Sequence, residues 1–296
     1  MSTVTPNKAL ITRRKPTKNK LVATIARHTG LILILTAILY PLLWMVAASF
    51  RPNDEIFSSL GIFSSHYTLG NYVDGWAPGG GTLQFSRFFL NSAIITSLSI
   101  VGTLLACSLT AYAFARLEFR FKNLLFALLL GTLLLPYHVT LIPQYILFNK
   151  LNLVNTFVPL IAPHYLAVDA FFVFLMVQFI RDIPKELDDA ARLDGAGHFR
   201  IFASIILPLA VPAIGTTALF TFINTWNDFL GPLIYLSNTN LWTVPLGLNN
   251  FLDASGGPSS YGGLFAMATL SLAPVVGFFV AFQKMLIEGI ATTGIK

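Results

Sequence analysis

Apolar runs that are long enough to cross a bilayer dominate this chain and constrain its fold more than any other feature. A helix needs about 20 mostly apolar residues to span the hydrocarbon layer. One such run ends near Gln283, and the others occupy residues 30–49, 89–114, 124–142, 157–180 and 205–233. We therefore predict an all-α, polytopic membrane protein with six transmembrane helices.

The composition of the chain is that of a membrane protein. Its 296 residues are 55% hydrophobic and only 11% charged, and the mean hydropathy is +0.70. A soluble globule needs more polar surface than this. The single cysteine, Cys107, excludes a disulfide within the chain and any C-x-x-C metal or redox motif.

The distribution of basic residues predicts how the chain is oriented. Six spans place both termini on one side, together with the loops that follow the second and fourth spans. All 19 lysines and arginines lie on that side except Arg51, Arg87 and Lys150. By the positive-inside rule this side is cytoplasmic. The net charge of +6 therefore reflects orientation in a lipid bilayer and indicates no nucleic-acid partner.

A charged stretch at residues 182–196 lies between the fourth and fifth runs, where a short loop would suffice. Pro184 suits the first turn of a helix, and acidic side chains follow it at the positive end of the helix dipole. Gly195 supplies the stop, because glycine adopts the left-handed conformation at low cost. We predict a short surface helix, one face of which carries Leu187, Ala190, Ala191 and Asp194.

The same stretch resembles the cytoplasmic loop that marks the permeases of binding-protein-dependent ABC importers. The pattern of that loop is Glu-Ala-Ala-x-x-Asp-Gly-Ala, with Pro-Leu-x-x-Pro further on, where this chain has Pro208, Leu209 and Pro212. Asp189 replaces the leading Glu with a side chain that is one methylene shorter. The matching residues, which the resemblance implies contact an ATPase subunit, are Asp189, Ala190, Ala191, Asp194, Gly195 and Ala196.

The likeness extends from about residue 85 to the C-terminus. Phe88-Phe-Leu-Asn-Ser92, Trp226-Asn-Asp-Phe229 and the ending from Gln283 are similar to the carbohydrate-uptake branch of these permeases, in particular to its second, maltose-G-like subunit. The resemblance implies a type I ABC importer permease fold. It also implies a place in a bacterial inner cell membrane, with both termini in the cytoplasm.

The resemblance further implies a set of partners. These are a second permease subunit, two ATP-binding subunits and an external solute-binding protein, which together import a sugar or oligosaccharide by alternating access. The sequence has no Gly-x-x-x-x-Gly-Lys-Ser/Thr stretch to hold ATP phosphates and no His-Glu-x-x-His metal motif. We therefore expect ATP and Mg to be bound by the partner ATPases. In this chain we expect no cofactor, metal or catalytic residue, and no enzymatic activity.

Polar residues at membrane depth are candidates for the substrate path, because hydrocarbon penalises them unless they face protein or water. Asparagine suits sugar hydroxyls, and an indole ring offers a flat apolar face. For Asp169 the alternative is pairing with a neighbouring hydroxyl or helix end, and for His138 and His164 we favour packing positions. The candidates are Asn91, Asp169, Asn224, Trp226, Asn227 and Asp228.

The chain divides into segments along these lines. We predict a basic tail (1–29), a first transmembrane helix (30–49), an external loop (50–85), a five-helix core (86–284) that includes a coupling loop (182–204), and a C-terminal tail (285–296). Within the core, residues 143–150 are typical of a short interfacial helix. Before the last span, the resemblance implies that Ser255, Gly256 and Gly257 contact the external binding protein; the alternative is a plain connector.

Other functions stay open at this point. The same fold could import a polyol or a sugar phosphate, although the scarcity of cations within the spans weighs against an anion. An ion-coupled secondary carrier would use Asp169 as its titrating group and would work alone under an ion gradient. A membrane-embedded enzyme is disfavoured, because no catalytic constellation is visible in the sequence.

Overall fold

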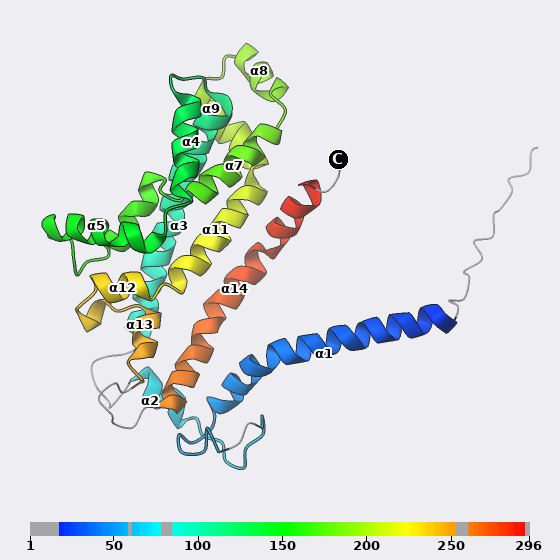
Figure 1. Ribbon diagram of the computed structural model, residues 1–296, viewed down its shortest axis with the longest axis vertical. Helices are drawn as coiled ribbons and strands as arrows, with labels where there is room; N and C mark the ends of the chain where they lie inside the picture. The colour runs from blue at the N-terminus through cyan, green and yellow to red at the C-terminus, as the bar shows by residue number, and fades with distance from the viewer. Residues whose placement is uncertain (1–17, 59–60, 78–84, 253–259, 294–296) are drawn as a thin grey trace, which may run out of the picture.

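The computed structural model describes residues 18–58, 61–77, 85–252 and 260–293 (Figure 1). The protein is 76% helical, and the described residues contain no strand, which confirms the predicted all-α class. The helices in chain order are α1 (Lys18–Ala48), α2 (Gly70–Trp76), α3 (Phe85–Arg116), α4 (Lys122–Thr132), α5 (Tyr137–Lys150), α6 (Val158–Ile161), η2 (Ala162–Leu166), α7 (Ala170–Asp182), α8 (Glu186–Leu193), α9 (His198–Ile201), η3 (Phe202–Ile206), α10 (Leu207–Leu209), α11 (Val211–Trp226), α12 (Leu230–Tyr235), η4 (Thr239–Leu241), α13 (Val244–Asn249) and α14 (Tyr261–Thr293).

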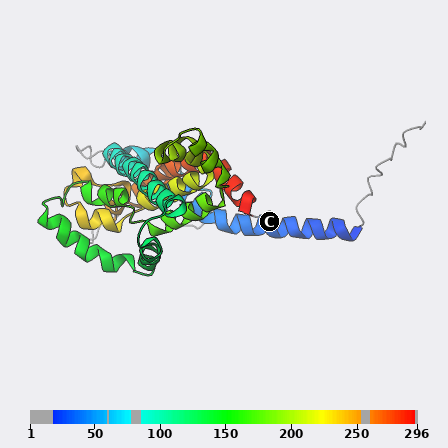
Figure 2. The ribbon, with the colours of Figure 1, turned by 90° about the horizontal axis from the view of Figure 1, so that it is seen from above.

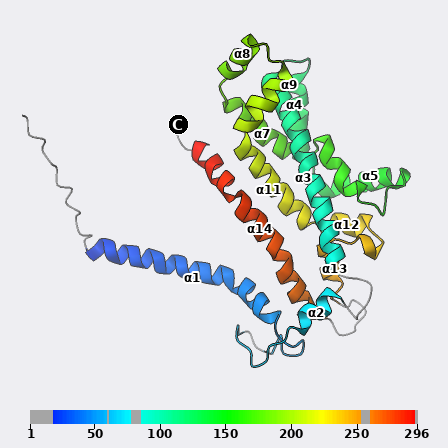
Figure 3. The same cartoon turned by 180° about the vertical axis from the view of Figure 1, so that it is seen from behind.

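The body of the protein is built around α3. Its most extensive contacts are with α7 and α11, and α14 packs on the far side of α11 (Figure 3). The short helix α8 lies at one end of this body, and α2 lies at the other (Figure 1). Helix α1 extends away from the body, as the view from above shows (Figure 2). Only 6% of its most apolar stretch, within Thr24–Ala48, is buried.

The buried surface of α3 includes a row of small and hydroxyl-bearing residues spaced three or four positions apart. Such residues let helix backbones approach closely in a membrane, where apolar burial gives no advantage over lipid. At Gly102 the approach is so close that a β-carbon would lie 2.5 Å from the ring of Tyr165. The residues of this row are Ser92, Thr96, Ser99, Thr103, Cys107 and Ala111.

Two apolar clusters pack against α3, one towards each end of the body. The cluster nearer α8 joins Cys107 and Ala111 to side chains of α7 and η3, including Val173, Met176 and Ile206. The cluster nearer α2 is aromatic and includes Phe85, Phe88, Phe222, Trp226 and Phe251. Residues 92–103 of α3 lie between the two clusters, and Ser92 and Ile95 line the smaller of the cavities described below.

The six-span count is not confirmed. The described residues contain four helices that are long and apolar enough to cross a membrane, and a fifth if a bent pair counts as one span. The prediction of one continuous helix over 124–142 was wrong: that run divides into α4 and α5 at Pro136, whose backbone is extended (φ −61°, ψ 133°). Proline disfavours the helical conformation at the preceding residue and supplies no N–H, so a break here is expected. The predicted interfacial helix at 143–150 is instead the C-terminal part of α5.

Helix breaks also divide the fourth and fifth runs. In the fourth run, α6 and η2 end at Ala167, which has a left-handed backbone (φ 52°), and Asp169 then precedes the first residue of α7. In the fifth run, the helical stretch His198–Leu209 meets α11 at an angle of 77°. Pro212 lies in the first turn of α11, where proline is tolerated.

The packing of α11 on α14 gives a stability prediction. A β-carbon on Gly215 would lie 2.8 Å from the β-carbon of Met285, which cannot swing aside. We expect Gly215→Ala to destabilise the purified protein by about 1–3 kcal/mol, the usual cost of overpacking. Gly131→Ala is the control, since nothing lies within 4 Å of a β-carbon there. Thermal unfolding in detergent should show a lower melting temperature for the first variant only; equal melting temperatures would contradict the packing described.

Candidate functional site

Helix α8 forms a defined corner at its end of the body. Acidic side chains occupy its first turn, as the helix dipole favours. Its C-terminus is closed by two backbone bonds: the N–H of Gly195 donates to the carbonyl of Arg192 (3.0 Å), and the N–H of Ala196 donates to the carbonyl of Ala191 (2.9 Å). Gly195 has φ 80°. This is a Schellman motif, and it confirms the predicted helix stop at Gly195.

The predicted face of α8 divides between solvent and protein. Ala191 and Ala196 are half-buried and pack against the apolar cluster of α3 and α7. Leu187, Ala190 and Asp194 are exposed. Beside them the structure exposes two large apolar side chains, Leu193 (90% exposed) and Phe199 (77% exposed). The outer surface of the corner therefore carries exposed apolar side chains, both small and large, with charged residues around them.

One residue of α8 is buried, and it is Asp188. Its Oδ2 lies 3.0 Å from Nε of Arg116, the last residue of α3, and the same guanidinium donates from Nη2 to the carbonyl of Ile183 (2.7 Å). Asp189 is exposed and pairs only with Arg192 on its own helix (Nη1–Oδ1, 3.3 Å). In the sequence, Arg116 counts only as one of the basic residues after the second span, and Asp188 only as one of the acidic side chains that follow Pro184. The pairing between them could not be read from spacing.

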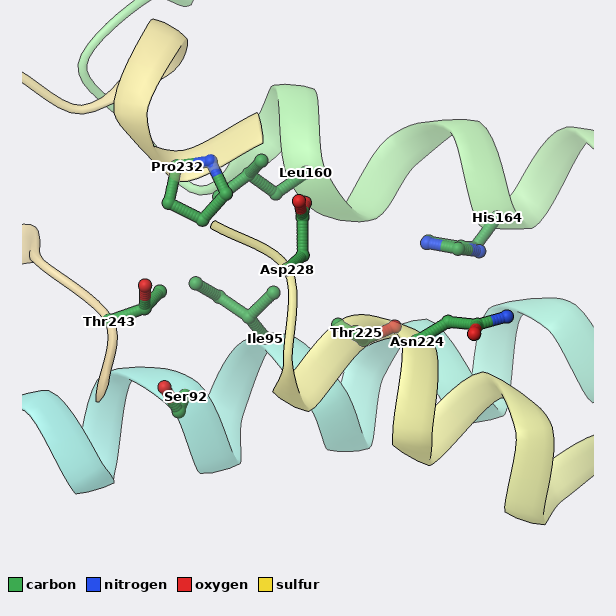
Figure 4. Close-up of a pocket in the computed structure, with 9 residues that line it drawn as sticks. All are labelled: Ser92, Ile95, Leu160, His164, Asn224, Thr225, Asp228, Pro232 and Thr243. Carbon is green, nitrogen blue, oxygen red and sulfur yellow. The ribbon is translucent and has the colours of Figure 1, made fainter. Parts of the chain in front are cut away.

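Two cavities, of about 200 Å³ and about 700 Å³, share part of their lining, and Ser92 and Ile95 of α3 line the smaller one. Leu160, His164, Asn224 and Asp228 line both (Figure 4). In the close-up His164 and Asn224 lie on facing elements, and Asp228 stands between Leu160 and the end of α11. Asp169 lines the larger cavity. Three of the predicted path residues, Asp169, Asn224 and Asp228, are thus brought together.

A polar cluster joins the cavity wall to α3. Nδ1 of His164 lies 3.0 Å from Oδ2 of Asp169 and 3.1 Å from the hydroxyl oxygen of Thr103. The Thr103 hydroxyl also lies 3.5 Å from Asp169 Oδ2, where it can donate. Asp169 therefore has the neighbouring hydroxyl partner that the alternative interpretation expected, and it faces the cavity as well. His164, for which packing was favoured, lines both cavities.

The other candidate path residues lie elsewhere. The amide of Asn91 is buried and donates to the carbonyls of Asn240 (3.0 Å) and Trp242 (2.9 Å), so it holds the segment before α13 on α3. Trp226 is buried in the aromatic cluster, stacked on Phe222. Asn227 is exposed and donates to the carbonyl of Ile223 (2.8 Å). Ser255, Gly256 and Gly257 lie outside the described residues.

Comparison with known proteins identifies the family. The family model "Binding-protein-dependent transport system inner membrane component" matches residues 99–291. This chain belongs to that family. The permease is accordingly a multi-pass membrane protein of a transporter family whose members are not enzymes. Within its described residues, no group of three or more His, Cys, Asp or Glu side chains is placed to hold a metal ion.

The permease has relatives of similar length. It is 35% identical over 291 residues to a probable ABC transporter permease protein of Bacillus subtilis, covering 98% of this chain and 95% of the relative. It is 35% identical over 270 residues to an arabinooligosaccharides transport system permease protein of Halalkalibacterium halodurans, covering 90% and 94%. Its fold is similar to a chain of a bacterial ABC transporter involved in import of the acidic polysaccharide alginate, with a TM-score of 0.79, 19% identity and coverage of 92% and 99%.

The closed end of α8 gives a local prediction. In the permease, Gly195→Ala places a side chain in the left-handed region, which costs about 1–2 kcal/mol, although space is free around it. The amide of Ala196 should then exchange with deuterium roughly five- to thirtyfold faster, since the bond to Ala191 opens more often. Gly197→Ala is the matched control, because Gly197 has an ordinary extended backbone (φ −77°, ψ 167°) and equal free space. Equal protection in both variants would contradict this role for Gly195.

Proposed function

We propose that this chain is one of the two permease subunits of an ATP-driven importer for a sugar or oligosaccharide. ATP is hydrolysed by two partner ATPases, and α8 with its flanking loop is the surface that they contact. The observation that carries the proposal is the corner at α8, where a rigid helix end presents Leu193 and Phe199 to solvent. A surface on which exposed apolar side chains are grouped within a rim of charged residues is typical of a protein contact.

The proposed topology places the α8 end in the cytoplasm and the α2 end outside. The bias of lysines and arginines supports this orientation. So does the path of α14, which begins beside α2 and runs towards the side of the body that carries α8 (Figure 1). An external solute-binding protein would then deliver its ligand at the α2 end. A second permease would cover part of the apolar surface that the long helices of the body leave exposed.

The larger cavity is the proposed stretch of the substrate path in this chain. A volume of about 700 Å³ falls in the range that small-molecule sites occupy. Its polar lining consists of amide, hydroxyl, imidazole and carboxylate groups, which can donate to and accept from sugar hydroxyls. Neither cavity is lined by a lysine or arginine among the described residues, and Asp169 and Asp228 line the larger one. These carboxylates favour a neutral sugar or polyol over a sugar phosphate.

Reconstitution tests the proposed function as a whole. The permease, its second permease, the two ATPases and the binding protein are placed in liposomes, and ATP hydrolysis is measured with a panel of sugars, polyols and sugar phosphates. We expect a neutral sugar or oligosaccharide to stimulate hydrolysis and to enter the liposomes. Uptake by this chain alone under a proton or sodium gradient would instead support an ion-coupled carrier.

The contact at α8 gives a binding prediction. Leu193→Ser removes a large exposed apolar side chain that the ATPase would bury, at a cost of about 2 kcal/mol. Affinity of the permease pair for the ATPases should fall roughly thirtyfold. Phe63→Ser is the control, since Phe63 is also exposed (86%) but lies in the segment that joins α1 to α2, at the other end. Titration of labelled ATPase onto detergent-purified permeases measures both, and unchanged affinity for the first variant would count against α8 as the contact.

The cavity gives a transport prediction. Asn224→Ala removes a cavity-lining amide, and loss of about one hydrogen bond to a sugar hydroxyl should lower import roughly fivefold. Asn227→Ala is the control: it is the same substitution three residues later, at an exposed amide that donates to the carbonyl of Ile223. We expect uptake of radiolabelled sugar to fall in the first variant and to stay at the wild-type level in the second. The reverse order would place the path along the other side of α11.

A further inference from the structure

The last residue of α3 holds the corner between α7 and α8. Arg116 contacts two different segments: its Nε lies 3.0 Å from Asp188 Oδ2 on α8, and its Nη2 donates to the carbonyl of Ile183 after α7 (2.7 Å). The bond to the Ile183 carbonyl is a directional hydrogen bond, and the contact with Asp188 is an ion pair between opposite charges. The corner is therefore tied to the end of α3 through one side chain that contacts the segments on both sides of Pro184.

The burial of this pair sets it apart from the other ion pairs of the described chain. The side chain of Arg116 is 1% exposed and that of Asp188 is 4% exposed. In the neighbouring pairs, Lys122–Glu118 and Arg192–Asp189, the carboxylate is largely exposed to solvent. Removing two charges from water is costly, so such a pair adds little net stability while it strongly defines geometry.

Helix α3 continues from this contact to the cavity. One turn before Arg116, the ring of Tyr112 packs on Phe202 of η3, with the ring centroids 5.2 Å apart. Helix α3 therefore contacts the chain both before α8, at Ile183, and after it, at Phe202. Thr103, which lies about 20 Å from Arg116 along the helix at 1.5 Å per residue, contacts His164 in the cavity wall. Helix α3 is unbroken from the α8 end of the body to the α13 end (Figure 3), so it joins the corner to Thr103 and, through it, to His164 in the cavity wall.

We propose that Arg116 and Asp188 are positioning residues for energy coupling, a link that makes α3 move with α8. The inference rests on the proposed function, because it takes α8 to be the surface moved by the ATPases. Movement of α8 is passed through the buried pair to the end of α3, and along α3 to the His164 side of the cavity. Without the pair, α8 can shift while α3 stays in place, and ATP is hydrolysed without import.

The test measures sugar imported per ATP hydrolysed in liposomes that contain the complete importer. The double variant Arg116→Met/Asp188→Leu replaces the ion pair by an apolar contact of similar size, which commonly preserves stability. We expect this variant to assemble with its ATPases at the wild-type melting temperature. Its import per ATP should fall about tenfold, within the range of coupling effects between linked sites. A purely structural role would leave that ratio unchanged.

Two further variants sharpen the test. Glu118→Gln breaks the exposed pair with Lys122 just beyond the same end of α3, and it should leave the ratio at the wild-type level. Arg116→Lys keeps the charge, but a single ammonium cannot reproduce the fork that holds Asp188 and the Ile183 carbonyl. We expect this variant to give an intermediate ratio.

The outcomes separate the link from the proposed function. If the wild-type complex shows no ATP-driven import, the proposed function is wrong and the link falls with it. If the wild-type complex imports sugar and the double variant has the same ratio, only the link is overturned. If the double variant does not assemble, import per ATP is measured instead on the assembled fraction of the Asp188→Asn variant. A lowered ratio supports the link, and a wild-type ratio overturns it.

Discussion

Close packing along the inner face of α3 is the interaction on which the rest of the structure depends. In a membrane, apolar side chains gain nothing by leaving lipid, so helices are held by close backbone approach and hydrogen bonds between them. The hydroxyl-bearing and small residues of α3 provide both, with Gly102 against Tyr165 and Thr103 against His164 and Asp169. Because α3 contacts α7, η2 and α11 at once, it sets where each of the other helices can stand.

The polar cavity follows from breaks in the helices that surround α3. Irregular backbone at membrane depth is tolerated where it lines a cavity or is buried in protein. Here the break between η2 and α7 places Asp169 at the wall, and the end of α11 places Asp228 there, with Oδ1 accepting from the N–H of Gly231 (3.1 Å). Helix α3 itself runs unbroken past the cavity wall and through both apolar clusters. Polar lining and ordered apolar packing are therefore separated along one helix.

Sequence reasoning reached features that depend on local chemistry and missed those that depend on distant partners. The end of α8 was predictable because the left-handed residue after a helix favours glycine, and Gly195 stands there. The division of the third run at Pro136 was missed because hydropathy continues across it unchanged. The indole ring of Trp226 has the flat apolar face that a sugar can stack on, but Phe222 and Phe89 already pack against that ring. The pairing of Asp188 with Arg116 joins residues far apart in the chain, so only the fold reveals it.

The corner at α8 must satisfy two demands that conflict in so short a helix. A surface that contacts a partner, as proposed for α8, has to expose most of its side chains, and eight residues that expose Leu187, Ala190 and Leu193 have little left to bury against the body. Apolar contact alone would leave such a helix free to rock, because Ala191 and Ala196 offer small, non-directional surfaces. A single buried carboxylate held by the guanidinium of Arg116 fixes the orientation of α8 while occupying one side-chain position. An ion pair that contributes little to stability is then the economical way to keep α8 both exposed and aligned with α3.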